Sequence, residues 1–147
     1  MSKFKLPTPV TDNAIWTEVW KDGESFGKFK VAYQDTNSPT WNLRFKQAAD
    51  LLSKSERHRA ENPKNEEDVL IKRHLYIRIL AAHYIVDSQM VAADGTIMMH
   101  NFADVLELLM TPELYFIAQE LDQFSVDDSN FKAAKQVKEA AEEAKKN

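Results

Sequence analysis

The sequence predicts a mainly helical α+β domain, in which an N-terminal β-hairpin precedes about five helices packed around a central apolar helix. Two observations predict this class: aromatic, alternating segments on both sides of an Asp-Gly pair, and later segments whose apolar residues recur every three or four positions. The chain has 147 residues, 44% of them hydrophobic and 29% charged, so it is long enough to bury one core. We expect residues 1–13 to be a flexible lead-in, residues 14–125 the hairpin and helical core, and residues 126–147 a charged C-terminal helix that frays at its end.

The hairpin is predicted around the pair Asp22-Gly23, which lies between two runs of aromatic and β-branched residues. Trp16 and Trp20 are four residues apart, so on a strand they share one face. The opposite face of that strand carries three smaller side chains: Ile15, Thr17 and Val19. Because both faces are partly apolar, we favour burial of the two tryptophans between helices. The alternative is a partner-binding surface, where aromatic residues are enriched.

The first helix is predicted over residues 38–59, with Ser38 as its N-cap and Pro39 at its first position. The most apolar helix is predicted over residues 69–91, after an acidic start and before a turn at Gly95. Because this segment is apolar nearly all round, we expect it to be the buried centre of the domain. Four of its side chains are expected to be fully buried: Leu75, Ile79, Ala82 and Val86.

Three further helices are predicted in the C-terminal third. Asn101 is suited to cap the helix that follows it, and Thr111-Pro112 to start the next one. Ser125, with Asp128 three residues later, is suited to begin a last, highly charged helix.

Charge is distributed unevenly along a chain whose formal net charge is −4. No Lys or Arg occurs between Arg78 and Lys132, and that interval contains nine Asp or Glu residues. Such a surface repels phosphate backbones and attracts basic proteins, although solubility alone also accounts for it. We therefore expect no nucleic-acid partner. The candidate partner-binding residues are Trp16, Trp20, Asp104, Glu107, Glu113 and Glu120.

The sequence offers no recognised catalytic, cofactor or metal-binding motif. The chain has no cysteine, its four histidines lack the spacing of zinc ligands, and its three glycines form no phosphate-binding loop. We expect a protein that is not an enzyme and needs no cofactor or metal. The most apolar stretch, 75–86, contains Arg78 and His83 and is too short to span a bilayer, and the N-terminus lacks a secretory signal. We therefore expect no membrane partner and a location in the cytosol.

Several short motifs follow one another in an order that resembles a known family. The F-K-x-A segment 45–48 lies in the first predicted helix, and an Asp-Gly turn, residues 92–97, follows the apolar helix. Residues 108–114 combine two leucines with a Thr-Pro pair, and Asn130-Phe131 lies near the start of the charged C-terminal segment. From Trp16 onward this order resembles the tail assembly chaperones of long-tailed bacteriophages.

The resemblance implies a protein that binds the long tape measure protein, keeps it soluble and recruits tail-tube subunits during assembly. It also implies a location in the host cytoplasm and absence from the finished virion, and it leaves self-association open. An amphipathic tape-measure helix is expected to lie against residues 101–124 by helix-in-groove binding.

Other protein-binding functions stay open. One is a small inhibitor or regulatory protein of the phage that uses an acidic face, which requires its acidic residues to lie on one surface. A tail-tube or completion subunit is disfavoured because such subunits are expected to be mainly β. An enzyme is disfavoured because no catalytic constellation is recognisable.

Overall fold

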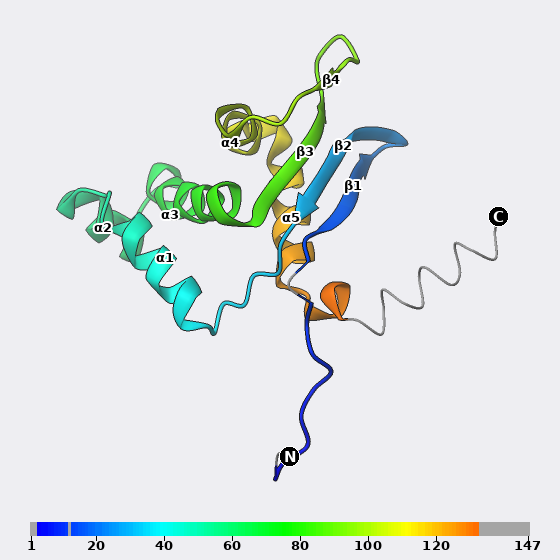
Figure 1. Ribbon diagram of the computed structural model, residues 1–147. Helices are drawn as coiled ribbons and strands as arrows, with labels where there is room; N and C mark the ends of the chain where they lie inside the picture. Colours follow the sequence, from blue (N-terminus) through cyan, green and yellow to red (C-terminus); the bar gives the residue numbers. More distant parts are fainter. Residues whose placement is uncertain (1–2, 12, 133–147) are drawn as a thin grey trace, which may run out of the picture.

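The computed structural model describes residues 3–11 and 13–132, which form five α-helices and a four-stranded antiparallel sheet (Figure 1). The protein is therefore an α+β mixture, and the prediction of a mainly helical fold whose only strands are a hairpin is wrong. In chain order the elements are β1 (Ile15–Lys21), β2 (Glu24–Val31), α1 (Pro39–Ala49), α2 (Lys54–Glu61), α3 (Glu66–Ile79), the π-helical turn η1 (Leu80–Tyr84), β3 (Ile85–Val91), β4 (Ile97–Met98), α4 (Phe102–Met110), the 3-10 turn η2 (Pro112–Leu114), α5 (Tyr115–Val126) and the 3-10 turn η3 (Asp128–Phe131).

The long helix predicted over residues 69–91 accounts for most of this difference. Helix α3 ends at Ile79, the single turn η1 follows, and the rest of the predicted helix is strand β3. Spacing alone does not assign such an apolar run, because Ser88 and Met90 also alternate with polar neighbours as in a half-buried strand. The strand β2 decides the conformation, since it supplies pairing partners for five of the seven residues of β3.

The change from helix to strand also changes which side chains are buried. Leu75 and Ile79 are buried as predicted, with exposed fractions of 5% and 2%. The predicted burial of Ala82 and Val86 is wrong, because the helical spacing ends before them. Ala82 lies in η1 and is exposed, and Val86 is an unpaired extra residue at a bulge in β3, where it is 47% exposed.

The hairpin is confirmed. Asp22 and Gly23 form its two-residue turn, with φ of 52° and 79°, the left-handed pair typical of a type I′ turn. The strand order is β1-β2-β3-β4, so β1 and β4 are the edges of the sheet. At the centre, Gly27 of β2 has φ of 123°, and a side chain there would lie 2.8 Å from the Gln89 carbonyl oxygen on β3. The glycine allows the two strands to approach closely.

Helix starts follow the capping residues. The side chains of Ser38 and Asn101 accept hydrogen bonds from backbone N–H groups in the first turns of α1 and α4, as predicted. The single helix predicted over residues 38–59 is instead two helices. Ser53 begins the second, because its hydroxyl accepts from the Glu56 N–H while the Glu56 carboxylate accepts from the Ser53 N–H.

A buried carboxylate joins α2 to α3. Asp68 is 4% exposed and accepts hydrogen bonds from the Lys64 backbone N–H at 3.0 Å and from Arg59 Nε at 2.7 Å. These bonds, led by the one from Lys64, lower the pKa of Asp68 below its ordinary value. The ion pair holds the two helices together.

The core lies between the sheet and the helices. Helix α5 packs against β2, where the rings of Phe26 and Phe116 meet edge to face at 5.0 Å. Helices α1, α2 and α3 lie to one side of the sheet (Figure 1). The apolar side chains with no exposed surface come from the sheet, α4, α5 and η3: Val19, Phe29, Val31, Met90, Val105, Leu109, Ile117, Leu121 and Phe131.

The two ends of the described chain meet. Val10 pairs with Lys132 in an isolated antiparallel bridge. Ser125, predicted to begin the last helix, lies inside α5, which ends at Val126, so that predicted start is wrong. Pro112 begins the turn η2, and α5 starts three residues later. Most of the predicted C-terminal helix, residues 133–147, lies outside the described residues.

Candidate protein-binding surfaces

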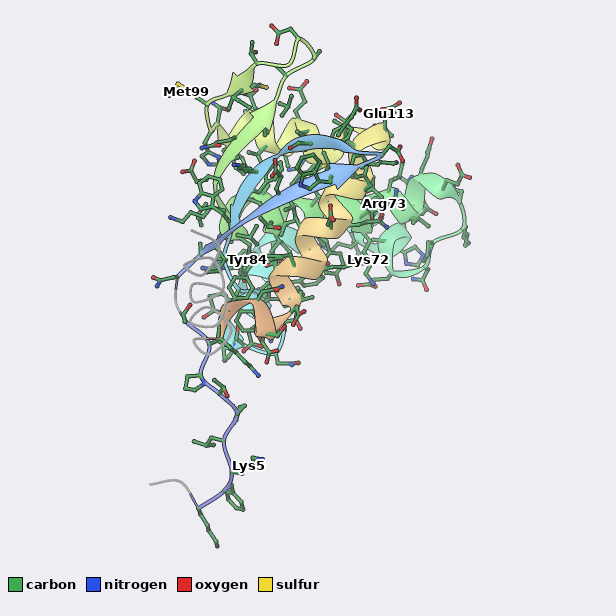
Figure 2. The ribbon with its side chains drawn as sticks, turned by 90° about the vertical axis from the view of Figure 1, so that its right-hand side faces the viewer. Lys5, Lys72, Arg73, Tyr84, Met99 and Glu113 are labelled. Atoms are coloured by element: carbon green, nitrogen blue, oxygen red, sulfur yellow. The ribbon has the colours of Figure 1, made fainter. Side chains whose placement is uncertain are left out.

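The sheet has one covered and one open face. Val19, Phe29 and Met90 point to the covered face and have no exposed surface. Residues that alternate with them, such as Lys28 and Gln89, are exposed on the other face. Figure 1 shows α5 behind the sheet and no helix of the described chain in front of it, and the side view in Figure 2 places α5 on one side of the strands only. Within residues 3–11 and 13–132, no helix therefore covers this face.

Both candidate tryptophans lie on this open face. Trp16 is 41% exposed and Trp20 is 55% exposed, so the expectation that both are buried between helices is wrong. Trp16 is three positions from the buried Val19 on β1, so the two side chains point to opposite faces of the sheet. Trp20 pairs with Ser25, whose hydroxyl donates a 2.7 Å hydrogen bond to Glu18, so Trp20, Ser25 and Glu18 share the face of Trp16. We call Trp16 and Trp20 with their neighbours on this face the tryptophan face.

The rest of the tryptophan face is polar and carries both signs of charge. Lys30 pairs with Trp16 on one side and with Asp87 on the other, and Lys28 pairs with Glu18. None of these four charged groups forms an ion pair within 4.0 Å in the part of the chain that the structure describes. The apolar surface of this face is thus concentrated on the edge strand β1.

The four candidate acidic residues are not all gathered at one groove. Asp104 and Glu107 lie on the same side of α4 and line a groove of about 240 Å³ beside β3 and β4. Glu113 lies on η2, on the helix side of the molecule in Figure 2, and Glu120 lies on α5. Neither lines that groove. An inhibitor that uses one acidic face requires these residues to lie on one surface, and only Asp104 and Glu107 line the same groove.

Tertiary packing makes the third tryptophan different from the other two. Trp41 is 9% exposed, and its indole N–H donates a 2.7 Å hydrogen bond to the Gln34 side chain. Gln34 in turn donates to Asp122 on α5 at 3.0 Å. These hydrogen bonds connect α1 to α5 through Gln34, so Trp41 stabilises the fold and is not a candidate for partner binding. Sequence reasoning missed the network because its members are up to 88 residues apart.

Asp94 and His100 each have a hydrogen-bond partner nearby in the fold. Asp94 accepts hydrogen bonds from the hydroxyl and the N–H of Thr96, which lower its pKa and close the Asp-Gly turn. His100 Nδ1 lies 2.7 Å from the Ser88 hydroxyl. Within residues 3–11 and 13–132, no group of three or more His, Asp or Glu side chains is arranged to hold a metal ion. No helix of that part is long and apolar enough to cross a bilayer.

Comparison with known proteins gives no match: no family model fits the chain, and neither the curated proteins nor the solved structures contain a significant relative.

Proposed function

We propose that the chain is a protein-binding assembly factor, and specifically a tail assembly chaperone that binds the phage tape measure protein, keeps it soluble and helps to recruit tail-tube subunits. The observation that carries the proposal is the exposure of Trp16 and Trp20 together on the open face of the sheet. The order of motifs from Trp16 to Asn130-Phe131 supports the choice of family.

The tryptophan face offers enough apolar surface to matter for binding. A tryptophan side chain buries about 150–250 Å² when fully covered. Covering the exposed 41% of Trp16 and 55% of Trp20 would remove roughly 150–240 Å² of apolar surface from water. At about 25 cal/mol per Å², this is worth about 4–6 kcal/mol before the costs of association. Lys28 and Lys30 lie on the same face as the two indole rings.

The test is co-expression of the chain with the tape measure protein of the same phage, followed by measurement of the soluble fraction of that protein. The wild-type chain should increase this fraction, and the Trp16→Ala/Trp20→Ala variant should not. A matched control is Leu43→Ala/Val69→Ala, which removes two side chains of similar exposure (56% and 47%) from the helices α1 and α3. The proposal is wrong if the wild-type chain does not increase the soluble fraction, or if the tryptophan variant acts as well as the wild type.

Fluorescence provides a direct measure of contact. The chain has three tryptophans, and in this structure only Trp41 is buried. Addition of a tape-measure fragment that lacks tryptophan should shift the emission of Trp16 and Trp20 to shorter wavelength, since their rings leave water. In Trp16→Phe/Trp20→Phe the remaining Trp41 emission should stay unchanged on the same addition. An unchanged wild-type spectrum despite binding would exclude the tryptophan face as the contact.

A further inference from the structure

A second surface lies on the helices, where residues of α1, α3, η1 and α4 line an apolar groove. We call it the arginine groove; its volume is about 290 Å³. None of its lining residues belongs to β1 or β2, so it is separate from the tryptophan face. Six of its ten lining side chains are apolar: Ala48, Leu51, Ile79, Ala82, Phe102 and Leu106.

The apolar lining of the arginine groove is accessible. Leu51 is 79% exposed and Phe102 is 49% exposed, and they come from the turn after α1 and from the first turn of α4. A cavity of about 150 Å³ accepts a benzene-sized group, so the groove accommodates about two side chains of that size. Two anchors three or four residues apart are what one face of an amphipathic helix presents.

The charges of the groove are all of one sign. Its four polar lining residues are Arg44, Gln47, Arg78 and His83, and no Asp or Glu lines it. Arg44 lies over the ring of Tyr84 at 5.3 Å, which orients its guanidinium group. Within the described residues neither Arg44 nor Arg78 has a carboxylate oxygen within 4.0 Å. Two positive charges therefore flank the apolar lining, and neither forms an ion pair with a carboxylate of the described residues.

His83 does not add to this positive charge at neutral pH. Burial, followed by repulsion from Arg44, lowers the pKa of His83 below its ordinary value of 6.5. The acidic groove of Asp104 and Glu107 is a different site, because it lies along another side of α4 from Phe102 and Leu106. One helix thus separates a basic apolar groove from an acidic one.

We propose that the arginine groove docks one amphipathic helix of a partner protein, whose apolar stripe is flanked by Asp or Glu side chains. The apolar anchors enter between Leu51 and Phe102, and the acidic residues pair with Arg44 and Arg78. This proposal goes beyond the tail-assembly function and does not depend on it, since the groove shares no residue with the tryptophan face.

The test uses the full chain and two synthetic peptides of about 18 residues, because isolated helices shorter than about 12–15 residues are marginal in water. Both peptides carry the same leucine stripe with a fluorescent label; one has glutamates beside the stripe and the other has lysines. Fluorescence anisotropy should give a dissociation constant at least about tenfold lower for the glutamate peptide, and salt should reduce this preference. Equal affinity for the two peptides would overturn the proposal.

Variants assign the binding to the groove. Arg44→Gln/Arg78→Gln should weaken binding of the glutamate peptide about three- to tenfold. The matched control Lys54→Gln/Lys72→Gln removes the same charge outside the groove and should leave the affinity unchanged. If both double variants weaken binding equally, only the net charge matters and the groove is not the site.

Two further variants keep the test decisive. Replacement of Arg44 removes its contact with Tyr84, which affects folding as well as binding. Leu51→Glu instead places an acid at a 79% exposed position and should also weaken binding of the glutamate peptide. Trp16→Ala/Trp20→Ala should leave peptide affinity unchanged, so the groove and the tryptophan face are tested separately. A peptide that binds only after deletion of residues 133–147, which include Glu139, Glu142 and Glu143, would show that the chain's own C-terminal segment fills the groove, and the proposal of an external partner would be wrong.

Discussion

Replacement of Gly27 by alanine is the sharpest test of the strand pairing that distinguishes this fold from the helical one expected from sequence. At φ of 123° an alanine is strained by about 1–3 kcal/mol. Its Cβ would also lie 2.8 Å from the Gln89 carbonyl oxygen and 3.1 Å from the Met90 Cα, and such overpacking costs about 1–3 kcal/mol. The lower entropy of the unfolded alanine chain offsets about 0.4–1 kcal/mol. We therefore expect Gly27→Ala to lower the free energy of unfolding by about 1–6 kcal/mol.

Gly23→Ala is the matched control. Gly23 also has a positive φ, of 79°, but nothing lies within 4 Å of the position its Cβ would take. The left-handed conformation costs an alanine about 1–2 kcal/mol, so after the same entropic offset a loss of about 0–1.5 kcal/mol is expected. Urea unfolding followed by far-UV circular dichroism gives both values by linear extrapolation. If Gly27→Ala costs no more than Gly23→Ala, no backbone lies against Gly27, and residues 85–91 are not the strand β3.

Three other predictions follow from burial and charge. Ile79→Ala should lower the free energy of unfolding by about 2–5 kcal/mol, because Ile79 is 2% exposed. Val86→Ala, at a 47% exposed position, should change it by less than about 0.5 kcal/mol. Equal losses in urea unfolding would refute the end of α3 at Ile79. Because folding lowers the pKa of Asp68, its carboxylate contributes stability above the ordinary Asp pKa of about 3.9, and the contribution is lost as the pH falls through the lower folded value. Thermal melts of Asp68→Asn should thus fall below wild type at pH 7 and approach it near pH 2 (roughly, below both pKa values), and a pH-independent difference would contradict this linkage. Three acids are exposed on the helices: Glu107, Glu113 and Glu120. Reversal of their charge should slow association with a basic partner and weaken the salt dependence of the association rate in stopped-flow measurements. An unchanged association rate at low salt would exclude these acids as part of the binding surface.

The parts of the fold that were predictable from sequence depend on neighbouring residues. The Asp22-Gly23 turn and the caps at Ser38 and Asn101 each follow from side chains within three or four positions of the backbone groups they serve. Strand β3 depends instead on pairing with β2, more than fifty residues earlier in the chain. The signal that could have indicated this pairing is Gly27, because a glycine within a strand marks a bulge or a close approach of another backbone.

The candidate surfaces show the same division. Strand alternation correctly placed Trp16 and Trp20 on one face, but whether that face is covered depends on where the helices pack. The arginine groove could not be predicted, because Arg44, Arg78 and Phe102 lie on three separate helices. Unpaired arginines beside apolar residues become meaningful only once packing brings them together.

The two faces of the seven-residue strand β1 have different roles, one in the core and one at the proposed binding surface. Val19 on its covered face has no exposed surface and belongs to the core, whereas Trp16 and Trp20 on its open face are 41% and 55% exposed. An antiparallel sheet normally places polar residues on a face that is left in water, and the inner strands β2 and β3 do so here with Lys28 and Gln89. The tryptophans lie instead on an edge strand, whose outer backbone groups are also unpaired by any described strand and open to another chain. A partner that covers the two indole rings therefore lies next to an open edge of the sheet, and replacement of the rings leaves the buried Val19 in place.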